Sequence, residues 1–312
     1  MQAEVCGRQA PDTTSTRSTS PVLRALLKSR SDTTVRASVD GVDQQQGVRR
    51  VGLATGVSVP YVSVGPSSAA TVVLLHAWGE SWHSFDRLLP LLPRTIHAVA
   101  MDLRGHGDAD KPAAGYSLVD VAADVAAFMD AVGVSSAVLV GSSSGGYVAQ
   151  QVAITSPHRV AGLVLVGSPA SLQGRPSFTD EVDRLTDPVD AAWVRKFLAW
   201  FPVFHPVPPW YLDGRVRDGA RMPAYVWRET LSGLITARPP TEAATITAST
   251  LLVWGACDEL LTREQQQALT AAIPASRLVV YEDTGHLVLW EQPERVASDL
   301  TAFVESLRQR PA

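Results

Sequence analysis

The stretch "VLVGSSSGGYVAQ", residues 138–150, places three consecutive serines between an apolar run and a segment with helical character. One of these hydroxyls could act as a nucleophile that forms a covalent intermediate. A sharp turn from a strand into a helix crowds the backbone, so the residues two before and two after its apex must lack bulky side chains. Only Ser143 has glycine at both positions, Gly141 and Gly145, in the pattern G-x-S-x-G. We therefore predict that Ser143 is the reactive serine.

The pattern G-x-S-x-G arises by chance in roughly one chain of this length in ten, so the prediction depends on partner residues. A serine hydroxyl needs a base, usually an imidazole that a carboxylate orients. His286 lies in a loop between a strand-like run and the last helical segment, and Asp258 directly follows another strand-like run. Open α/β sheets assemble their sites at the carboxyl ends of strands, where Ser143 also lies. We predict a Ser143, His286 and Asp258 triad, with the N–H of Ser144 in an oxyanion hole.

The elements that must position these residues alternate from about Arg49 onward, which predicts a mostly parallel sheet covered by helices. Residues 49–65 resemble two strands with a turn near Gly56. Further strands are expected within residues 71–76, 96–102, 137–140, 159–169, 249–255 and 276–282, and helices within 117–133 and 293–310. Residues 1–48 are rich in Ser, Thr, Arg and Gln and are interpreted as a flexible N-terminal extension.

Residues 171–238 interrupt the alternation and are rich in aromatic side chains. We interpret them as a helical cap, and residues 49–170 and 239–312 as the α/β core. For most of these aromatics, packing against the core is the simpler role, but an aromatic segment above the sheet could also form the roof of an apolar pocket. Trp193, Trp200 and Trp210 are the first candidates for substrate binding, because indoles supply the largest apolar area.

Composition excludes several classes of partner. The 312 residues are 46% hydrophobic, enough for a sizeable core, and the formal charge of −4 gives no electrostatic case for binding nucleic acid or an anionic membrane. No apolar run reaches membrane-spanning length, and the two cysteines lack metal-ligand spacing. There is no apolar core of secretory-signal length. We therefore expect a cytoplasmic protein that needs no metal or organic cofactor.

Five ordered motifs make the chain resemble the α/β-hydrolase fold superfamily. They are "LLHAWGES", "DLRGHGDADKP", "GSSSGG", "WGACDELL" and "TGHLVLWEQPERV", and the resemblance runs from about Arg49 to the C-terminus. It implies a mostly parallel central sheet flanked by helices, with a helical cap inserted after the sixth strand. It also implies that the N–H of Trp78 is the second oxyanion donor, although Ala77 stands where the family has glycine.

The resemblance also bears on the reaction. Relatives that open epoxides or displace halide carry aspartate in place of Ser143, so the serine favours hydrolysis of a carboxylic ester or lactone through an acyl-enzyme. We expect a small, apolar substrate, which can carry an aromatic group, because the cap is rich in aromatic residues. Alternatives with the same triad are C–C bond hydrolysis and cofactor-free haloperoxidase-like chemistry. An alternative of another class is a ligand-binding, receptor-like protein on this fold.

Overall fold

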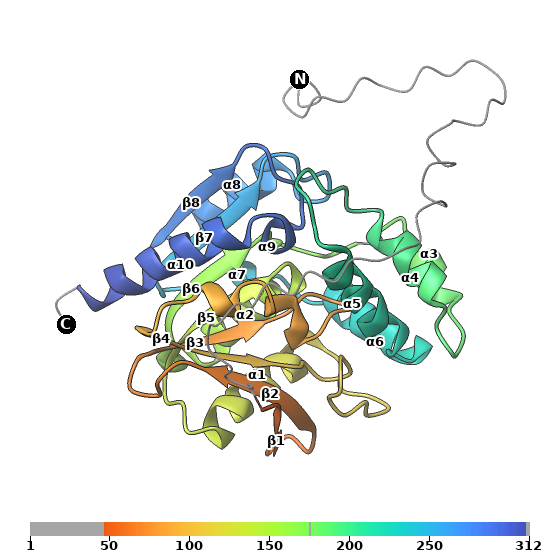
Figure 1. Cartoon of the computed structure of the whole chain (residues 1–312), viewed down its shortest axis with the longest axis horizontal. Coiled ribbons are helices and arrows are strands. Elements are labelled where there is room, and N and C mark those ends of the chain that lie inside the picture. The colour runs from red at the N-terminus through yellow and green to blue at the C-terminus, as the bar shows by residue number, and fades with distance from the viewer. Residues whose placement is uncertain (1–46, 175, 310–312) are drawn as a thin grey trace, which may run out of the picture. The chain divides into compact units, whose positions relative to one another are not determined.

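The computed structural model describes residues 47–174 and 176–309 (Figure 1). The predicted N-terminal extension, residues 1–48, therefore lies almost wholly outside the described residues. Within the described ranges one eight-stranded sheet has the order β1-β2-β4-β3-β5-β6-β7-β8. The strands are β1 Arg49–Gly52, β2 Ser58–Val64, β3 Ala70–Leu75, β4 Ile96–Met101, β5 Ala137–Ser142, β6 Val160–Val166, β7 Thr250–Gly255 and β8 Ser276–Tyr281. The pairs β1–β2 and β2–β4 are antiparallel and the other five pairs are parallel, so the sheet is mostly parallel, which confirms the predicted fold class.

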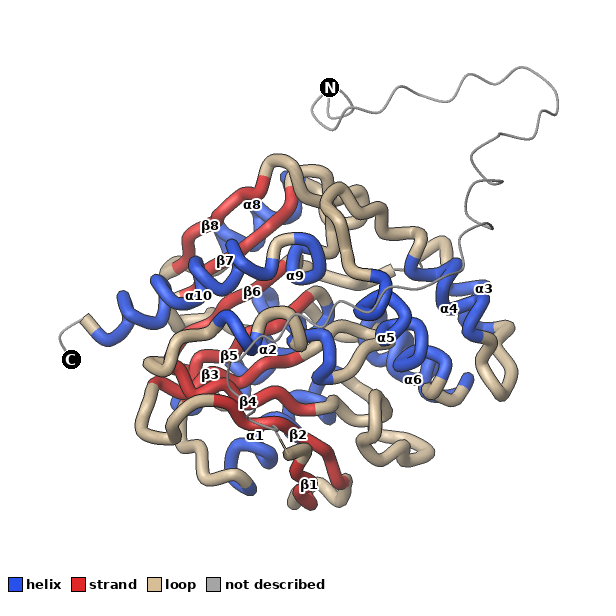
Figure 2. Tube along the Cα trace, in the orientation of Figure 1, coloured by secondary structure: helices blue, strands red, loops and turns tan. Residues whose placement is uncertain are grey.

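Both faces of the sheet are covered, which explains why its strands appear in the sequence as continuous apolar runs. In β3, Val73 and Leu75 belong to one buried cluster, and Val72 and Leu74 belong to the cluster on the opposite face. Helices α1 Leu118–Ala131, α2 Ser144–Thr155 and α8 Arg263–Ala272 supply side chains to the first cluster. The short α9 Val288–Glu291 and the long α10 Pro293–Arg308 supply the second (Figure 2).

Local signals in the sequence set the ends of the predicted helix α1. Ser117 accepts a hydrogen bond from the N–H of Asp120, whose side chain bonds back to the Ser117 N–H, and these two bonds form a capping box. Gly133, just beyond the helix, has a φ of 73°, a conformation that glycine adopts without strain. None of the helices in the described ranges combines the length and the apolar character needed to cross a membrane.

The segment between β6 and β7 contains five helices within the described residues. They are α3 Thr179–Asp183, α4 Ala191–Leu198, α5 Pro209–Ala220, α6 Ala224–Ile235 and α7 Pro240–Ala243. A third buried cluster, separate from the two on the sheet, joins α4, α5 and α6 through side chains that include Val194, Phe197, Val216 and Trp227. We call residues 167–249 the insertion. In Figure 1, α3 to α6 lie together to one side of the sheet.

The sheet order places one crevice in its middle. β3 lies between β4 and β5, so the chain leaves β3 toward one side of the sheet and returns to continue on the other. Ligands of open α/β sheets bind at such a switch point, outside the carboxyl ends of the strands. The loop after β3 and the turn after β5 meet there, and the loops after β7 and β8 lie along the same edge.

Candidate active site

The turn between β5 and α2 holds Ser143 in a conformation that few residues adopt. Its φ of 48° and ψ of −120° make it the one non-glycine residue with positive φ in the described ranges. A Cβ atom on Gly141 would lie 2.3 Å from the backbone N of Gly146, and one on Gly145 would lie 2.3 Å from the carbonyl O of Leu75. The two glycines therefore permit the sharp turn that lifts Ser143 above the sheet.

The side chains of Ser143, His286 and Asp258 form a chain of hydrogen bonds. Oγ of Ser143 lies 3.1 Å from Nε2 of His286, and Nδ1 of His286 lies 2.8 Å from Oδ2 of Asp258. Oδ1 of Asp258 accepts from the backbone N–H groups of Leu260 at 2.8 Å and Leu261 at 3.0 Å, which fixes the carboxylate. The loops after β5, β7 and β8 thus bring together the three residues that the sequence predicted as a triad.

The surroundings of His286 favour its protonated form. Burial alone would lower the pKa of this imidazole, but the charge and the hydrogen bond of Asp258, together with the charge of Glu80, raise the pKa above its ordinary value of 6.5. Asp258 and His286 are each only 7% exposed, so little water screens their attraction. An imidazolium formed at His286 would therefore be stabilised where it forms.

The two predicted oxyanion donors are Trp78, in the loop after β3, and Ser144, the first residue of α2. His76 holds this loop, because its Nδ1 lies 2.8 Å from the carbonyl O of Ala77 and its Nε2 accepts from the N–H of Leu103. Ala77 does not have a positive φ, so this backbone accepts alanine in place of glycine. The N–H of Trp78 donates to Oγ of Ser144 at 2.7 Å. The N–H of Ser144, at the first position of α2, has no acceptor within the helix.

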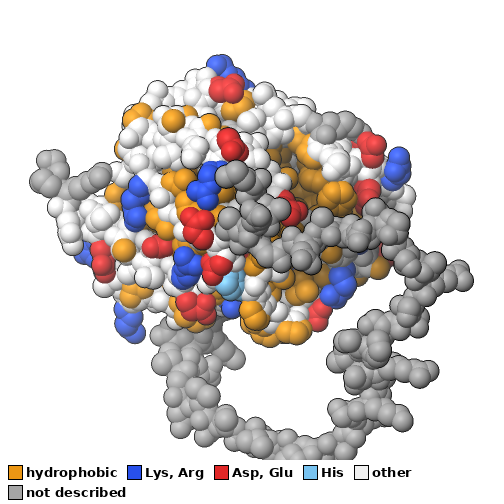
Figure 3. Space-filling model, turned by 90° about the horizontal axis from the view of Figure 1, so that it is seen from above, with side chains coloured by type: hydrophobic (Ala, Val, Ile, Leu, Met, Phe, Trp, Pro, Cys, Tyr) orange, Lys and Arg blue, Asp and Glu red, His pale blue; other side chains and the backbone are white. Residues whose placement is uncertain are grey.

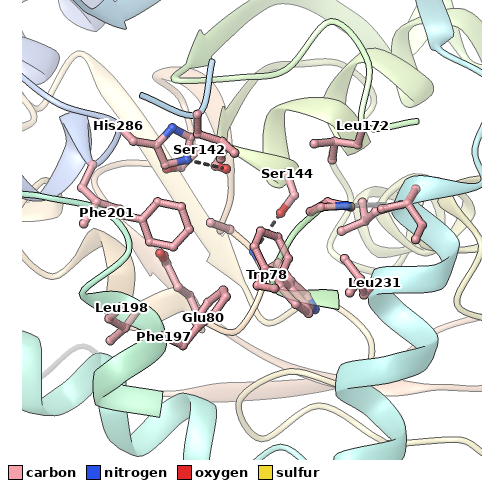
Figure 4. Close-up of a pocket in the computed structure, with 18 residues that line it drawn as sticks. Trp78, Glu80, Ser142, Ser144, Leu172, Phe197, Leu198, Phe201, Leu231 and His286 are labelled. Carbon is pink, nitrogen blue, oxygen red and sulfur yellow. Dashed lines mark hydrogen bonds between the residues drawn. The ribbon is translucent and has the colours of Figure 1, made fainter. Parts of the chain in front are cut away.

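A cavity that is partly open to solvent adjoins Ser143 and His286. Figure 3 shows hydrophobic side chains gathered around a hollow in this face of the molecule. Aromatic side chains of the lining are Trp78, Phe178, Phe197 and Phe201, and aliphatic ones include Leu172, Leu198, Leu231 and Leu234. In Figure 4, Phe201 lies beside His286, whose hydrogen bond to Ser143 is dashed, and Leu172 and Leu231 lie across the pocket. No group of three or more His, Cys, Asp or Glu residues in the described ranges could hold a metal ion.

Comparison with known proteins places this architecture in a family. Residues 72–299 match the model of the alpha/beta hydrolase family. The protein belongs to that family. This hydrolase is 30% identical to a non-heme chloroperoxidase of Streptomyces lividans, over 80% of its own length and 97% of the relative. It is 31% identical to a pimeloyl-[acyl-carrier protein] methyl ester esterase of Neisseria meningitidis, over 79% and 80% of the two chains.

A solved structure shares both fold and sequence with this hydrolase. It is described as an N-acyl homoserine lactone degrading enzyme and has a TM-score of 0.68 and 28% identity. The match covers 82% of the hydrolase and 100% of that chain. Esterases, lactonases, a haloperoxidase and epoxide hydrolases all occur among the similar proteins. The family is thus shown, whereas its members differ in the bond that they act on.

The three tryptophans predicted to bind substrate do not line this cavity in the hydrolase. Trp193 packs in an aromatic cluster, stacked on Phe197 with ring centroids 5.5 Å apart. Trp200 is 47% exposed and lies in a neighbouring depression that also contains His286. Trp210 is 57% exposed and lines a separate depression. The aromatic lining of the cavity comes instead from three phenylalanines of the insertion and from Trp78 of the loop after β3.

Phe201 and Glu80 are two of the lining residues that the sequence analysis did not predict. The Phe201 ring lies 5.2 Å from the imidazole of His286, at an interplanar angle of 30°. Glu80 is 4% exposed and lines the cavity from the loop after β3. A signal for Glu80 was available, because a carboxylate within the apolar motif "LLHAWGES" is unusual for a buried loop. Phe201 had no such signal among the many aromatics of the insertion.

Proposed function

We propose that the protein is a serine hydrolase whose substrate is a small, apolar carboxylic ester or lactone. Aromatic esters and lactones belong to this substrate class. The observation that carries this proposal is the hydrogen-bonded chain from Ser143 through His286 to Asp258, which opens into a cavity walled by aromatic and aliphatic side chains. The insertion would act as a cap, with residues 171–238 as its predicted extent. A cytoplasmic location stays a prediction from the sequence.

In this mechanism His286 takes the proton of Ser143 while Oγ attacks the acyl carbon. Asp258 stabilises the imidazolium, which then protonates the leaving alcohol. The N–H groups of Trp78 and Ser144 would stabilise the oxyanion, and each such donor contributes about 3 kcal/mol to the transition state. The hydroxyl of Ser144 now accepts a hydrogen bond from the Trp78 N–H, and rotation of this hydroxyl would free the N–H for the oxyanion. Water, activated by His286, then hydrolyses the acyl-enzyme.

The chemistry of the nucleophile favours acyl transfer over the opening of epoxides. Attack by a serine hydroxyl on an epoxide would give an ether, which offers no carbonyl for water to attack. A carboxylate nucleophile gives an ester, which water can hydrolyse. Ser143 therefore supports an ester or lactone substrate, although epoxide hydrolases occur among the similar proteins.

A matched set of serine variants tests this function. Wild-type protein should hydrolyse an aryl ester and react with a fluorophosphonate at Ser143. Ser143→Ala should lose about 10⁶-fold in kcat and all labelling, since the nucleophile and its base act as a unit. Ser142→Ala and Ser144→Ala keep the nucleophile and should retain measurable activity. Absence of turnover on a panel of esters and lactones would favour the ligand-binding, receptor-like alternative.

A second candidate is peroxide-dependent chemistry, favoured by the 30% identity to a non-heme chloroperoxidase. Hydrogen peroxide could replace water as the attacking group, so that the acyl-enzyme releases a peracid and frees the Ser143 hydroxyl. The same triad would serve, as it would in C–C bond hydrolysis. Peracid formation from acetate and hydrogen peroxide, compared with the rate of aryl ester hydrolysis, separates the two activities.

A further inference from the structure

Glu80 is a buried carboxyl group in an otherwise apolar cavity wall. It is 4% exposed, and Figure 4 shows its side chain reaching from the loop after β3 toward Phe201 and His286. Of the lining residues in the described part of the chain, Glu80 alone carries a carboxyl group, and none is lysine or arginine. Only Oε2 has a side-chain hydrogen-bond partner there, the Ser84 hydroxyl. The other oxygen, Oε1, has no side-chain partner among the described residues, and the one further hydrogen bond of the carboxyl group is with the backbone of Ala77.

Behind Glu80 lies an arginine that is already paired. Arg215 of α5 contacts Oδ2 of Asp218 at 2.8 Å and donates to Oγ of Ser84 at 2.9 Å, and its side chain is 2% exposed. The guanidinium thus pairs with Asp218, and it acts on Glu80 through its charge. Burial raises the pKa of the Glu80 carboxyl above its ordinary value. The charge of Arg215 and the hydrogen bonds from Ser84 and the backbone of Ala77 lower this pKa, but burial has the larger effect.

A wholly apolar substrate would leave this carboxyl group desolvated. When a ligand displaces water from a buried polar group without replacing its hydrogen bond, the cost reduces binding. A ligand that donates a hydrogen bond to this carboxyl group avoids this cost, and sites built in this way discriminate strongly against analogues that lack the donor. We propose that Glu80 is a substrate-specificity residue that binds a hydroxyl group on the apolar part of the ester or lactone. This inference rests on the proposed hydrolase function.

A hydroxyl group suits this position better than an ammonium group. A hydroxyl can donate to the carboxylate and can also accept from the protonated acid, so it pairs with either form of Glu80. An ammonium group pairs only with the carboxylate and would have to lose its own hydration in a cavity whose remaining walls are mainly apolar. The preferred substrate is therefore an apolar ester or lactone with one hydroxyl group.

The test compares 4-nitrophenyl octanoate with its 2-, 3-, 6-, 7- and 8-hydroxy derivatives. Wild-type protein should favour at least one hydroxylated ester over the unsubstituted one by about 10-fold or more in kcat/KM. Glu80→Leu should reduce this preference about 10- to 100-fold, the range for a hydrogen bond to a charged group. Glu80→Gln keeps a donor and an acceptor and should lose less of it. Glu229→Leu, the same change on an exposed position of α6, should leave the preference unaltered.

The ratio between substrates separates specificity from a structural role. If Glu80 only supports the loop that carries Trp78, both variants should slow all esters alike and leave the preference unchanged, which would overturn the proposal. Equal rates of wild-type protein on all six esters would also overturn it. Glu80→Gln, which is closest in shape, keeps the test valid if Glu80→Leu does not fold.

Binding distinguishes failure of this inference from failure of the proposed function. Ser143→Ala can be titrated with the same esters, and quenching of the protein's tryptophan fluorescence reports binding because Trp78 lines the cavity. Tighter binding of a hydroxylated ester, lost in the Ser143→Ala/Glu80→Leu double variant, supports the role of Glu80 even if the wild type hydrolyses none of them. Equal binding of all six esters refutes that role.

Discussion

Replacement of Asp258 by asparagine should disable His286 without disturbing the fold. Oδ1 of Asp258 accepts hydrogen bonds from the backbone N–H groups of Leu260 and Leu261, so the carboxamide oxygen of asparagine must take this position. The reverse orientation would point the NH₂ group at these two backbone donors, and the buried N–H of Leu261 left without an acceptor would cost about 1–3 kcal/mol. The NH₂ group therefore faces Nδ1 of His286, which must then accept a hydrogen bond.

This orientation fixes the wrong tautomer of His286. With Nδ1 as acceptor, the proton sits on Nε2, which can no longer take the proton of Ser143. The loss expected in kcat is about 10⁴-fold, equivalent to about 5 kcal/mol of transition-state stabilisation. The two backbone hydrogen bonds remain, so the melting temperature should change little. The assay is aryl ester hydrolysis, together with the rate of fluorophosphonate labelling of Ser143.

Asp283 provides the matched control, because it is the nearest other aspartate in the sequence around His286 and its side chain is 62% exposed. Asp283→Asn should keep kcat within about 2-fold of wild type, as surface substitutions usually do. If Asp258→Asn retains kcat within about 10-fold of wild type, the orientation argument fails. A large loss in Asp283→Asn instead would assign the acid to that residue.

The acidic limb of the pH profile of kcat/KM should lie above pH 6.5, because the pKa of His286 is raised and the base must be neutral to act. A limb below that pH would contradict the assigned environment of His286. Phe201→Ala should lower kcat/KM for a naphthyl ester about 10-fold more than for a small acetate ester, since remote contacts orient only large substrates. Trp210→Ala removes a side chain that is 57% exposed and should change neither rate, so an equal loss in both variants would refute a specific role for Phe201.

The predictable parts of this protein are those that local chemistry determines. Strands such as β3 and β5 are buried on both faces, so each leaves an uninterrupted apolar run in the sequence. The position of Ser143 at the apex of the turn follows from the backbone contacts that exclude a Cβ atom at Gly141 and Gly145. These signals involve only a few neighbouring residues, so they can be recognised in the sequence without knowledge of the tertiary structure.

The local sequence does not determine which face of a helix is buried. In α5, Trp210 is 57% exposed whereas the adjacent Tyr211 is 1% exposed, so the size of an aromatic side chain does not reveal its position. The buried face of the same helix also carries Arg215 and Asp218, which pair with each other. A search for the most apolar face would therefore misplace this helix. The polar partners on the loop after β3 explain why it packs as it does.

Those partners attach the insertion to the loop that carries the predicted oxyanion donor. Asp218 accepts from the hydroxyl of Ser81 at 2.7 Å, and the indole N–H of Trp78 donates to Thr230 of α6 at 2.7 Å. Both bonds are directional, so they fix this loop relative to α5 and α6 more tightly than apolar contacts alone. Glu80 and the N–H of Trp78 belong to the same loop, which means that contacts with the insertion position both groups. Under the proposed function, selection of the substrate and stabilisation of the oxyanion would then depend on one set of buried hydrogen bonds.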